Sequence, residues 1–338
     1  MLCVGFDIGG TKCAVILGEY GPPAAGNSSG SGNGAGDGDG ACAIGIAKKT
    51  VFPTAGSPQA TIQTACGIID AMLAERGAAP GEISGIGISC GGPLDAEGGR
   101  ILSPPNLPGW DDIPVAGILR ERYATTVRLE NDANACAVAE WKFGAARGAR
   151  NAVFLTFGTG LGAGLILDGR LYRGASGMAG ELGHIRLSEF GPVGYGKAGS
   201  FEGFCSGGGI ARLAGQMALE RIQMGEKPGF APTADKIAGI TAKSVADAAN
   251  GGDPLAREAY AVSGAYLGRG LAIVVDLLNP EIIVIGSVFA RSRQLMIDAM
   301  ERELSRESLA ISLGACRIAP AALGESVGDY AALCLALP

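Results

Sequence analysis

The chain has 338 residues, of which 47% are hydrophobic and 18% charged, and a formal net charge of −6, a composition typical of a globular protein of about two domains. No stretch concentrates Lys and Arg, which argues against nucleic acid or an anionic membrane as a partner. The nine cysteines include no CxxC pair, and the longest apolar run, at 271–278, is too short to span a bilayer. We therefore expect a cytoplasmic protein with reduced, buried thiols and no signal peptide.

The first predicted elements are two short strands joined by a glycine-rich turn. Apolar residues at 2–6 and 13–17 flank the segment Asp7-Ile8-Gly9-Gly10-Thr11-Lys12, a pattern typical of a hairpin. Residues 21–41 consist mainly of Gly, Ala, Ser, Asn and Asp. Such a segment buries too little surface to order itself, so we expect a flexible loop there.

Alternating helix and strand patterns follow in the first half of the chain. Ile62, Cys66, Ile69 and Leu73 recur at helical spacing, which predicts a helix between residues 58 and 77. After it we expect a strand at 83–89, a Gly/Pro loop at 91–93, a turn around Asn106, a helix at 113–123, a strand at 125–130 and a helix from Asn131 to about Phe143.

The opening pattern recurs near the middle of the chain. An apolar strand at 153–157, the turn Gly158-Thr159-Gly160-Leu161-Gly162 and a strand at 163–167 repeat it, and aligning Asp7 with Thr156 places Gly9 on Gly158. Two copies about half the chain apart suggest two similar α/β domains around a cleft. Later, a long helix ending near Asn279, a buried strand at 281–285 and a helix opened by Gly286-Ser287 fit the same plan.

The glycine turns are candidate phosphate-binding loops, because without a Cβ their backbone N–H groups can approach anionic oxygens closely. Asp7 could hold a water of a Mg²⁺ ion, and Lys12 could add a point charge. Taken alone, either turn is more often an ordinary tight hairpin. Gly158-x-Gly160-x-x-Ala163 does not indicate a dinucleotide site, because a strand rather than a helix follows it, and the chain has no GxxxxGK[ST] loop.

Taken together, these segments resemble a known superfamily. Asp7–Lys12, Gly158–Gly162 and Ile283–Gly286 resemble the two phosphate motifs and the adenosine motif of actin-like ATPases and sugar kinases, and Glu130–Ala135 and Gly180–His184 resemble the ROK family (repressors, open reading frames and kinases) within it. The motifs occur in the expected order over nearly the whole chain. The resemblance implies a two-domain α/β fold of the actin-like ATPase (RNase H-like, hexokinase-type) class with an interdomain cleft, and ATP-dependent phosphorylation of a sugar hydroxyl.

The resemblance also implies roles for individual residues. Asp132 would be the general base that takes the proton of the attacking hydroxyl, a contribution of roughly 10²–10⁴-fold. The remaining sugar hydroxyls would be held by Gly92, Asn106, Asn131, Glu181, His184 and Glu202. ATP would be bound by Asp7, Gly9, Gly10, Thr11, Lys12, Thr159, Gly160, Gly286 and Ser287. Ser287 departs from the glycine usual at its position, which bears on nucleotide fit but not on the reaction type.

Each of these residues has a structural alternative when taken alone. Asn131 and Asp132 lie where a strand meets a helix, where Asn and Asp usually act as N-caps. Glu181 can be an exposed loop charge, Glu202 a cap of the following helix, and His184, the single histidine of the chain, a structural residue. The ordered set of motifs, rather than any one member, favours the sugar site.

Many ROK proteins carry a structural zinc held by a histidine and a C-x-C-G-x-x-G-C-x-E segment. In this chain the three cysteine positions hold Val193, Tyr195 and Ser200, although both glycines and Glu202 are present. Valine has no ligand atom, and Tyr and Ser are poor zinc ligands beside thiolate and imidazole. We therefore predict that no zinc is bound and that another interaction, with Tyr195 a candidate, orders the loop at 191–205.

Three functions remain open from the sequence. The first is an ATP-dependent hexose kinase, with glucose the default substrate and the 6-hydroxyl the expected acceptor. The second is a kinase for another sugar: N-acetylmannosamine, allose, fructose or a glycoside. The third is a non-catalytic, sugar-responsive regulator; because the first strand starts at residue 2, we expect no N-terminal helix-turn-helix of the kind that ROK repressors carry.

The expected domains are a small N-terminal α/β domain formed by residues 1–120 and 324–338, and a large C-terminal α/β domain formed by residues 121–323. The resemblance implies that the last helix, from about Gly324, returns to the N-terminal domain. It also implies a homodimer, which no feature of the sequence shows directly.

Overall fold

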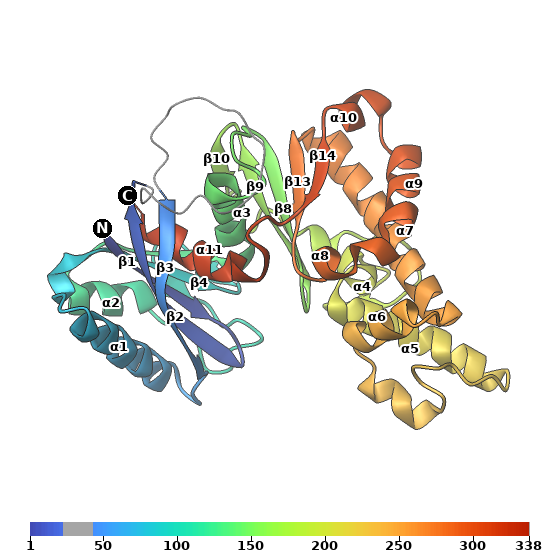
Figure 1. Cartoon of the computed structure of the whole chain (residues 1–338), viewed down its shortest axis with the longest axis horizontal. Helices are drawn as coiled ribbons and strands as arrows, with labels where there is room; N and C mark the ends of the chain where they lie inside the picture. The colour runs from blue at the N-terminus through green and yellow to red at the C-terminus, as the bar shows by residue number, and fades with distance from the viewer. Residues whose placement is uncertain (23–42, 338) are drawn as a thin grey trace. The chain divides into compact units, whose positions relative to one another are not determined.

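The computed structural model of the protein describes residues 1–22 and 43–337 (Figure 1). The chain forms two compact units: unit 1 comprises Met1–Ala135 and Ser326–Pro338, and unit 2 comprises Cys136–Glu325. From residue 23 onward, the flexible loop expected at 21–41 lies outside the described residues, and Gly21 is the last residue of a strand.

Unit 1 is built on a five-stranded sheet. Its strand order is β3 (Ala43–Pro53), β2 (Lys12–Gly21), β1 (Leu2–Ile8), β4 (Ile83–Cys90) and β7 (Val127–Asn131). The first three strands pair antiparallel, whereas β4 and β7 run parallel to β1. The short hairpin of β5 (Leu94–Asp95) and β6 (Arg100–Ile101) and the 3-10 helix η1 (Pro80–Glu82) complete its connections.

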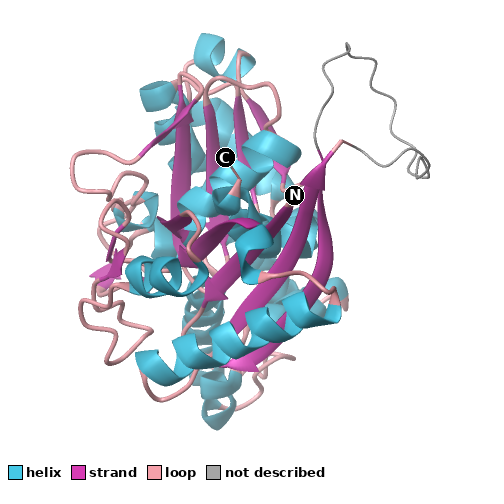
Figure 2. Ribbon diagram, turned by 90° about the vertical axis from the view of Figure 1, so that its left-hand side faces the viewer, coloured by secondary structure: helices cyan, strands magenta, loops and turns pink. Residues whose placement is uncertain are grey.

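Helices lie against the strands of each sheet (Figure 2). In unit 1, Val4, Phe6 and Ile8 point to one face because side chains alternate along a strand, and they share a hydrophobic core with α1 (Pro58–Glu75) and α2 (Val115–Tyr123). Ser57 caps α1 by accepting a hydrogen bond from the Ala60 amide. The opposite face receives α11 (Val327–Ala336).

Glycines allow α11 to approach the sheet closely. Gly5, Gly18, Gly85 and Gly87 face the helix, and a Cβ at any of them would collide with its atoms. At Gly87 the added carbon would meet the Ala332 carbonyl oxygen well inside van der Waals contact. Helix backbone therefore rests directly on strand backbone, a packing that no residue larger than glycine permits.

Unit 2 repeats the plan of unit 1. Its sheet has the order β10 (Arg170–Tyr172), β9 (Leu161–Leu167), β8 (Ala152–Phe157), β13 (Ile282–Ile285) and β14 (Arg317–Pro320), again with three antiparallel strands followed by two parallel ones. β1 and β8 are each followed by a three-residue turn, at 9–11 and 158–160. The repeat of a strand, a glycine turn and a strand predicted from the sequence is confirmed.

The helices of unit 2 form a core against its sheet. They are α4 (Phe201–Phe204), α5 (Gly207–Gln223), α6 (Ala242–Asn250), α7 (Pro254–Leu278), α8 (Val288–Ser292), α9 (Ile297–Glu307) and α10 (Ala310–Gly314). Shorter elements are the hairpin of β11 (Val193–Gly194) and β12 (Lys197–Ala198) and the 3-10 helices η2 (Leu182–His184), η3 (Ala234–Gly239), η4 (Arg293–Leu295) and η5 (Gly324–Ser326).

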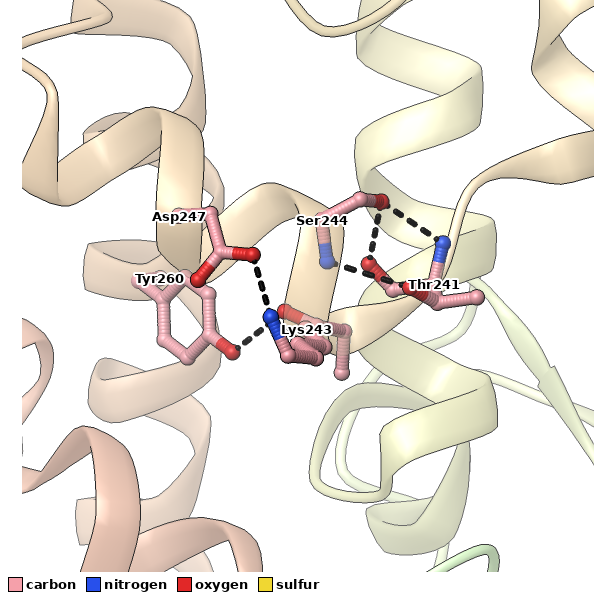
Figure 3. Close-up of polar contacts among 6 residues, drawn as sticks. Thr241, Lys243, Ser244, Asp247 and Tyr260 are labelled. Atoms are coloured by element: carbon pink, nitrogen blue, oxygen red, sulfur yellow. Dashed lines mark hydrogen bonds and ion pairs between the residues drawn. The ribbon is translucent and has the colours of Figure 1, made fainter.

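Helix α6 shows how the sequence fixes a helix start and docks it on α7 (Figure 3). Thr241 and Ser244 form a reciprocal capping box, with two N–H···O bonds of 3.0 Å. The Tyr260 hydroxyl of α7 donates to the Ala242 carbonyl at 2.9 Å, and Lys243 pairs with Asp247 at 2.6 Å. The capping box thus fixes where α6 begins, and the hydrogen bond from the Tyr260 hydroxyl fixes its position against α7.

Helix α7 is longer than the apolar run seen in the sequence. Among the described helices it alone is long and apolar enough to cross a membrane by length and composition, and half of its most apolar window is buried inside the structure. Leu267, Leu271 and Val275 lie in the core of unit 2. The apolar composition of α7 therefore matches that of a core helix.

A buried carboxylate anchors the two chain segments next to the boundary between the units. Helix α3 (Asp132–Phe143) carries Glu140, which is fully buried. Its oxygens accept N–H bonds from Ala145 (2.7 Å), Ala322 (3.2 Å) and Leu323 (2.9 Å). These contacts compensate the loss of hydration that burial of a charge entails.

The close contact between α11 and the sheet leads to a prediction. Replacing Gly87 by Ala should lower the free energy of unfolding by about 1–3 kcal/mol or more, because the new methyl group overlaps the backbone of α11. Gly45→Ala, in the edge strand of the same sheet with open space around it, is the matched control and should be nearly neutral. Urea unfolding monitored by circular dichroism measures both; equal stability of the two variants would contradict the packing described.

Candidate active site

The candidate residues of unit 1 emerge at one edge of its sheet. Asp7 of β1 lies opposite Ser89 of β4, and Cys90 of β4 lies opposite Asn131 of β7. Because β1, β4 and β7 are parallel, the segments that follow them lie side by side at their carboxyl ends, the usual place for ligands in α/β sheets.

The turn between β1 and β2 is tightly supported. The Gly9 N–H donates to the Lys12 carbonyl at 3.1 Å, and the Thr54 hydroxyl donates to the Gly9 carbonyl at 2.6 Å. A Cβ on Gly10 would collide with the Asn106 carbonyl oxygen, so the turn lies directly on the loop that carries Asn106. Thr11, like Lys12, is exposed to solvent.

Asn131 and Asp132 lie at the junction of β7 and α3. The Asn131 side-chain oxygen accepts from the Ala133 N–H at 2.9 Å, which is the capping role open from the sequence. Its amide nitrogen lies near Gly92, where a Cβ would come within 3.5 Å. One Asp132 oxygen accepts from the Ala133 N–H at 2.8 Å, and the side chain is exposed.

The two carboxyl groups of this edge have raised pKa values. Burial, together with the charges of Asp132 and Asp329, raises the pKa of Asp7 to about 6, although a hydrogen bond with Ser89 and the charge of Lys49 oppose the shift. Asp132 has exposed surface, but the protein atoms packed around its carboxyl group displace much of the surrounding water and raise its pKa as well, partly offset by backbone N–H bonds. Two carboxylates and few compensating cations make this edge suited to a bound cation or a proton.

In unit 2, the turn at 158–160 is held against the start of α5. The Gly207 N–H donates to the Gly158 carbonyl at 2.7 Å. A Glu202 oxygen accepts from the Leu161 N–H at 3.1 Å and would lie 2.7 Å from a Cβ on Gly160. Glu202 thus ties α4 to the candidate phosphate turn.

Glu181 and His184 belong to the segment beside that turn. The Ala163 N–H donates to the Gly180 carbonyl at 3.1 Å, and Gly180 has a φ of +94°, which favours glycine. Because a Cβ on Gly183 would collide with the Leu161 carbonyl oxygen, η2 lies directly against the start of β9. Glu181 is exposed and His184 partly buried.

Gly286 and Ser287 follow β13, the strand next to β8. The Gly286 N–H donates to the Leu155 carbonyl at 3.0 Å. Ser287 has φ +51° and ψ −110°, a backbone conformation that a residue with a Cβ adopts only under strain. The serine therefore occupies a position shaped for glycine.

Each unit thus gathers its own share of the candidate residues. Unit 1 brings together Asp7, Gly9, Gly10, Thr11, Lys12, Gly92, Asn106, Asn131 and Asp132, and unit 2 brings together Thr159, Gly160, Glu181, His184 and Glu202, with Gly286 and Ser287 at the neighbouring strand end. Sequence reasoning missed Ser89 and Thr54, which support Asp7 and Gly9. Their only signal is strand register, which a single sequence does not reveal.

The residues at the expected zinc positions do not fit that metal. Val193 offers no donor atom, and the fully buried Ser200 hydroxyl accepts the Gly203 N–H at 3.1 Å as the cap of α4. Within residues 1–22 and 43–337, no three His, Cys, Asp or Glu side chains are grouped as a metal site would require. Seven of the eight described cysteines are buried, and Cys316 is partly buried.

Comparisons with known proteins agree with the geometry. The model of a family described as the ROK family matches residues 36–337. A glucokinase of Streptomyces coelicolor is 33% identical over 309 residues, covering 90% of this chain and 87% of its own length. A xylose repressor of Bacillus subtilis is 28% identical over 271 residues, covering 80% and 65%. The structure of a ROK family glucokinase from Streptomyces griseus in complex with glucose and AMPPNP superimposes with a TM-score of 0.73 at 28% identity, covering 99% of each chain.

The strain at Ser287 leads to a prediction. Ser287→Gly should raise the free energy of unfolding by about 1 kcal/mol, because glycine adopts a positive φ without a steric penalty. Ser312→Gly, inside α10, is the matched control and should lower stability, since glycine is a poor helix former. Thermal unfolding of both variants tests this; a loss of stability at both positions would show that Ser287 is unstrained.

Asp7 leads to a pH prediction. Its pKa is about 6 in the folded chain against 3.8 for an unperturbed Asp side chain, so between these values the folded protein binds more protons than the unfolded one. The free energy of unfolding contributed by Asp7 should therefore fall as the pH rises from about 4 to about 6. Asp7→Asn should remove this dependence and stabilise the ligand-free protein above pH 7 by about 1–2 kcal/mol.

The exposed Asp235→Asn serves as the control for this measurement, because it makes the same chemical change away from the site. Denaturant unfolding across pH 4–8 follows both variants. An Asp7→Asn protein with the same pH profile as wild type would contradict the assignment.

Proposed function

The chain belongs to the ROK family and has the two-domain actin-like ATPase fold of its sugar kinases, and on this premise we propose that it phosphorylates a hexose with ATP. The observation that carries the proposal is Asp132. Its exposed carboxylate stands at the junction of β7 and α3, at the sheet edge that also presents the turn at 9–11. A raised pKa makes this carboxylate a stronger base for the proton of an attacking hydroxyl.

The other polar residues suit a polyol. Amide, carboxylate and imidazole groups offer directed hydrogen bonds to neighbouring hydroxyls. We assign this role to Gly92, Asn106, Asn131, Glu181, His184 and Glu202. Asn131 retains its amide N–H groups for the sugar, because its oxygen caps α3.

The glycine turns suit phosphate. Gly9 and Gly10 have no room for a Cβ, because the carbonyl oxygens of Lys12 and Asn106 lie against them, so this turn requires glycine. Glycine turns let backbone N–H groups approach an anionic ligand closely. We assign ATP to Asp7, Gly9, Gly10, Thr11, Lys12, Thr159, Gly160, Gly286 and Ser287. Magnesium, when bound with the nucleotide, supplies charge neutralisation of the phosphates. Asp7, whose pKa is raised chiefly by burial, is the carboxylate that would hold a water of that ion.

Glucose is our default substrate, and phosphorylation at the 6-hydroxyl our default reaction, because curated relatives of this chain are glucokinases. N-acetylmannosamine, allose, fructose or a glycoside remains the alternative, since the same polar residues can bind several epimers. Because xylose repressors are also among the relatives, a non-catalytic regulator is the second candidate function. Asp132 beside a glycine turn favours the kinase, because a sensor needs no base.

We further propose a cytoplasmic homodimer. Exposed apolar side chains of α7 and α10 support a second copy as partner: Leu277 is 73% exposed, Leu309 63% and Ile311 86%. Leu309 lies next to α7, since its N–H donates to Asp276 at 3.0 Å. Leu309 therefore lies near the end of α7 that carries Leu277, and exposed apolar surface of this kind commonly marks an interface.

The kinase proposal predicts the effect of Asp132→Asn. The amide keeps the size of the side chain but cannot accept a proton, so the turnover number should fall by about 10²-fold or more with ATP affinity unchanged. A coupled ADP-release assay over a panel of sugars measures this, with Asp235→Asn as control. Full activity in Asp132→Asn would contradict the assignment of Asp132 as the general base. A wild-type protein that binds a sugar and ATP without turnover would favour the non-catalytic regulator.

A further inference from the structure

The loop from Ile185 to Ser200 joins η2 to α4, and therefore joins His184 to Glu202. Its two ends are held together by backbone hydrogen bonds. The Phe201 N–H donates to the Ile185 carbonyl at 2.8 Å, and Arg186 and Ser200 form an antiparallel bridge. Between them, β11 and β12 form a hairpin whose turn is Tyr195-Gly196. This hairpin supplies the side chains that contact His184.

Tyr195 adopts an uncommon backbone conformation. Its φ is +43° and that of Gly196 is +77°, so both central residues of the two-residue turn have positive φ, as in a type I′ turn. Asn-Gly is the preferred sequence for such turns, and an aromatic residue there is strained. A residue held in a strained backbone conformation suggests that its side chain has a role outside the turn.

The side chain of Tyr195 contacts the imidazole of His184. The ring centroids are 5.1 Å apart at an interplanar angle of 83°, an edge-to-face contact. Next in the hairpin, the Lys197 ammonium donates to the His184 carbonyl at 2.6 Å. One hairpin therefore holds both the ring and the backbone of this histidine.

The third contact reaches Glu202. Ser200 is fully buried, and its hydroxyl accepts the Gly203 N–H at 3.1 Å and lies 3.4 Å from the Gly194 carbonyl. It thus fixes the first turn of α4, which carries Glu202, onto strand β11. A zinc ion has no place in this arrangement, because Val193, Tyr195 and Ser200 supply packing and capping in place of thiolates.

We propose that Tyr195, Lys197 and Ser200 form a metal-free clamp that positions His184 and Glu202 for the sugar. Tyr195 is the positioning residue for the imidazole, and it acts through His184 without touching the substrate. The proposal rests on the assignment of His184 and Glu202 to the sugar site. If so, substitutions in the hairpin turn should change the affinity for the sugar and leave the affinity for ATP unchanged.

The test compares Tyr195→Asn with Tyr195→Phe in untagged full-length protein. Asn suits the turn better than Tyr, so Tyr195→Asn should unfold at the same or a higher temperature while losing the aromatic contact. The sugar KM should rise about 2- to 10-fold, the equivalent of one aromatic pair, with the KM for ATP unchanged. Tyr195→Phe keeps the ring and should match wild type.

His184 is the single histidine of the chain, so its imidazole NMR signals report the clamp without any need for turnover. Tyr195→Asn should move them, because the ring current of Tyr195 is lost, and Tyr195→Phe should leave them in place. A protein that phosphorylates no sugar would still give this result, so failure of the kinase proposal and failure of the clamp are distinguishable. Unmoved His184 signals in Tyr195→Asn, or lower thermal stability than in wild type with wild-type sugar affinity, would overturn the proposal.

The zinc content of the purified protein is a second test of the clamp. Purified protein should contain much less than one zinc per chain, and a zinc-selective chelator should change neither the His184 signals nor the unfolding temperature. One equivalent of zinc per chain, or a shift of the His184 signals on chelation, would overturn the metal-free clamp directly.

Discussion

A buried carboxylate holds together the two segments by which the chain enters and leaves unit 2. Glu140 lies four residues beyond the point where α3 enters unit 2, and the amides it binds at Ala322 and Leu323 lie just before the chain returns to unit 1. Removing its side chain would leave three N–H groups without their acceptor in a dry environment. The two ends of unit 2 are therefore coupled, because neither segment can shift within unit 2 without disturbing the other.

The duplicated sheet explains why functional residues occur in both units. In each unit the first strand, its glycine turn and the second strand form the same three-residue connection, but the residues beside it differ. Unit 1 places carboxylates there, Asp7 and Asp132, whereas Thr156 takes the aligned position in unit 2 and bonds the Gly162 N–H at 2.9 Å. The same connection therefore carries a buried carboxylate in unit 1 and a hydroxyl that supports its own turn in unit 2.

Much of the fold followed from local patterns, because apolar periodicity and glycine turns act over a few residues. The strands at 2–6 and 153–157, the helix at 58–77 and the family were predicted and are confirmed. The edge strand β3 was missed, since most of its residues are exposed and its sequence lacks an alternating pattern of apolar and polar residues. The support of Asp7 by Ser89 and the positive φ of Tyr195 depend on register and turn geometry, which arise only when distant segments meet.

The packing of α11 on the glycines of unit 1 bears on the order in which the protein is made. Unit 1 begins with the first strands of the chain, yet the helix that covers one face of its sheet is synthesised only after the whole of unit 2. On the ribosome, the glycine-lined face therefore remains uncovered while about two hundred residues are added, a delay of roughly ten seconds or more at typical rates. Unit 2 can fold as a continuous segment in that interval, so the domain that starts first is the last to be completed.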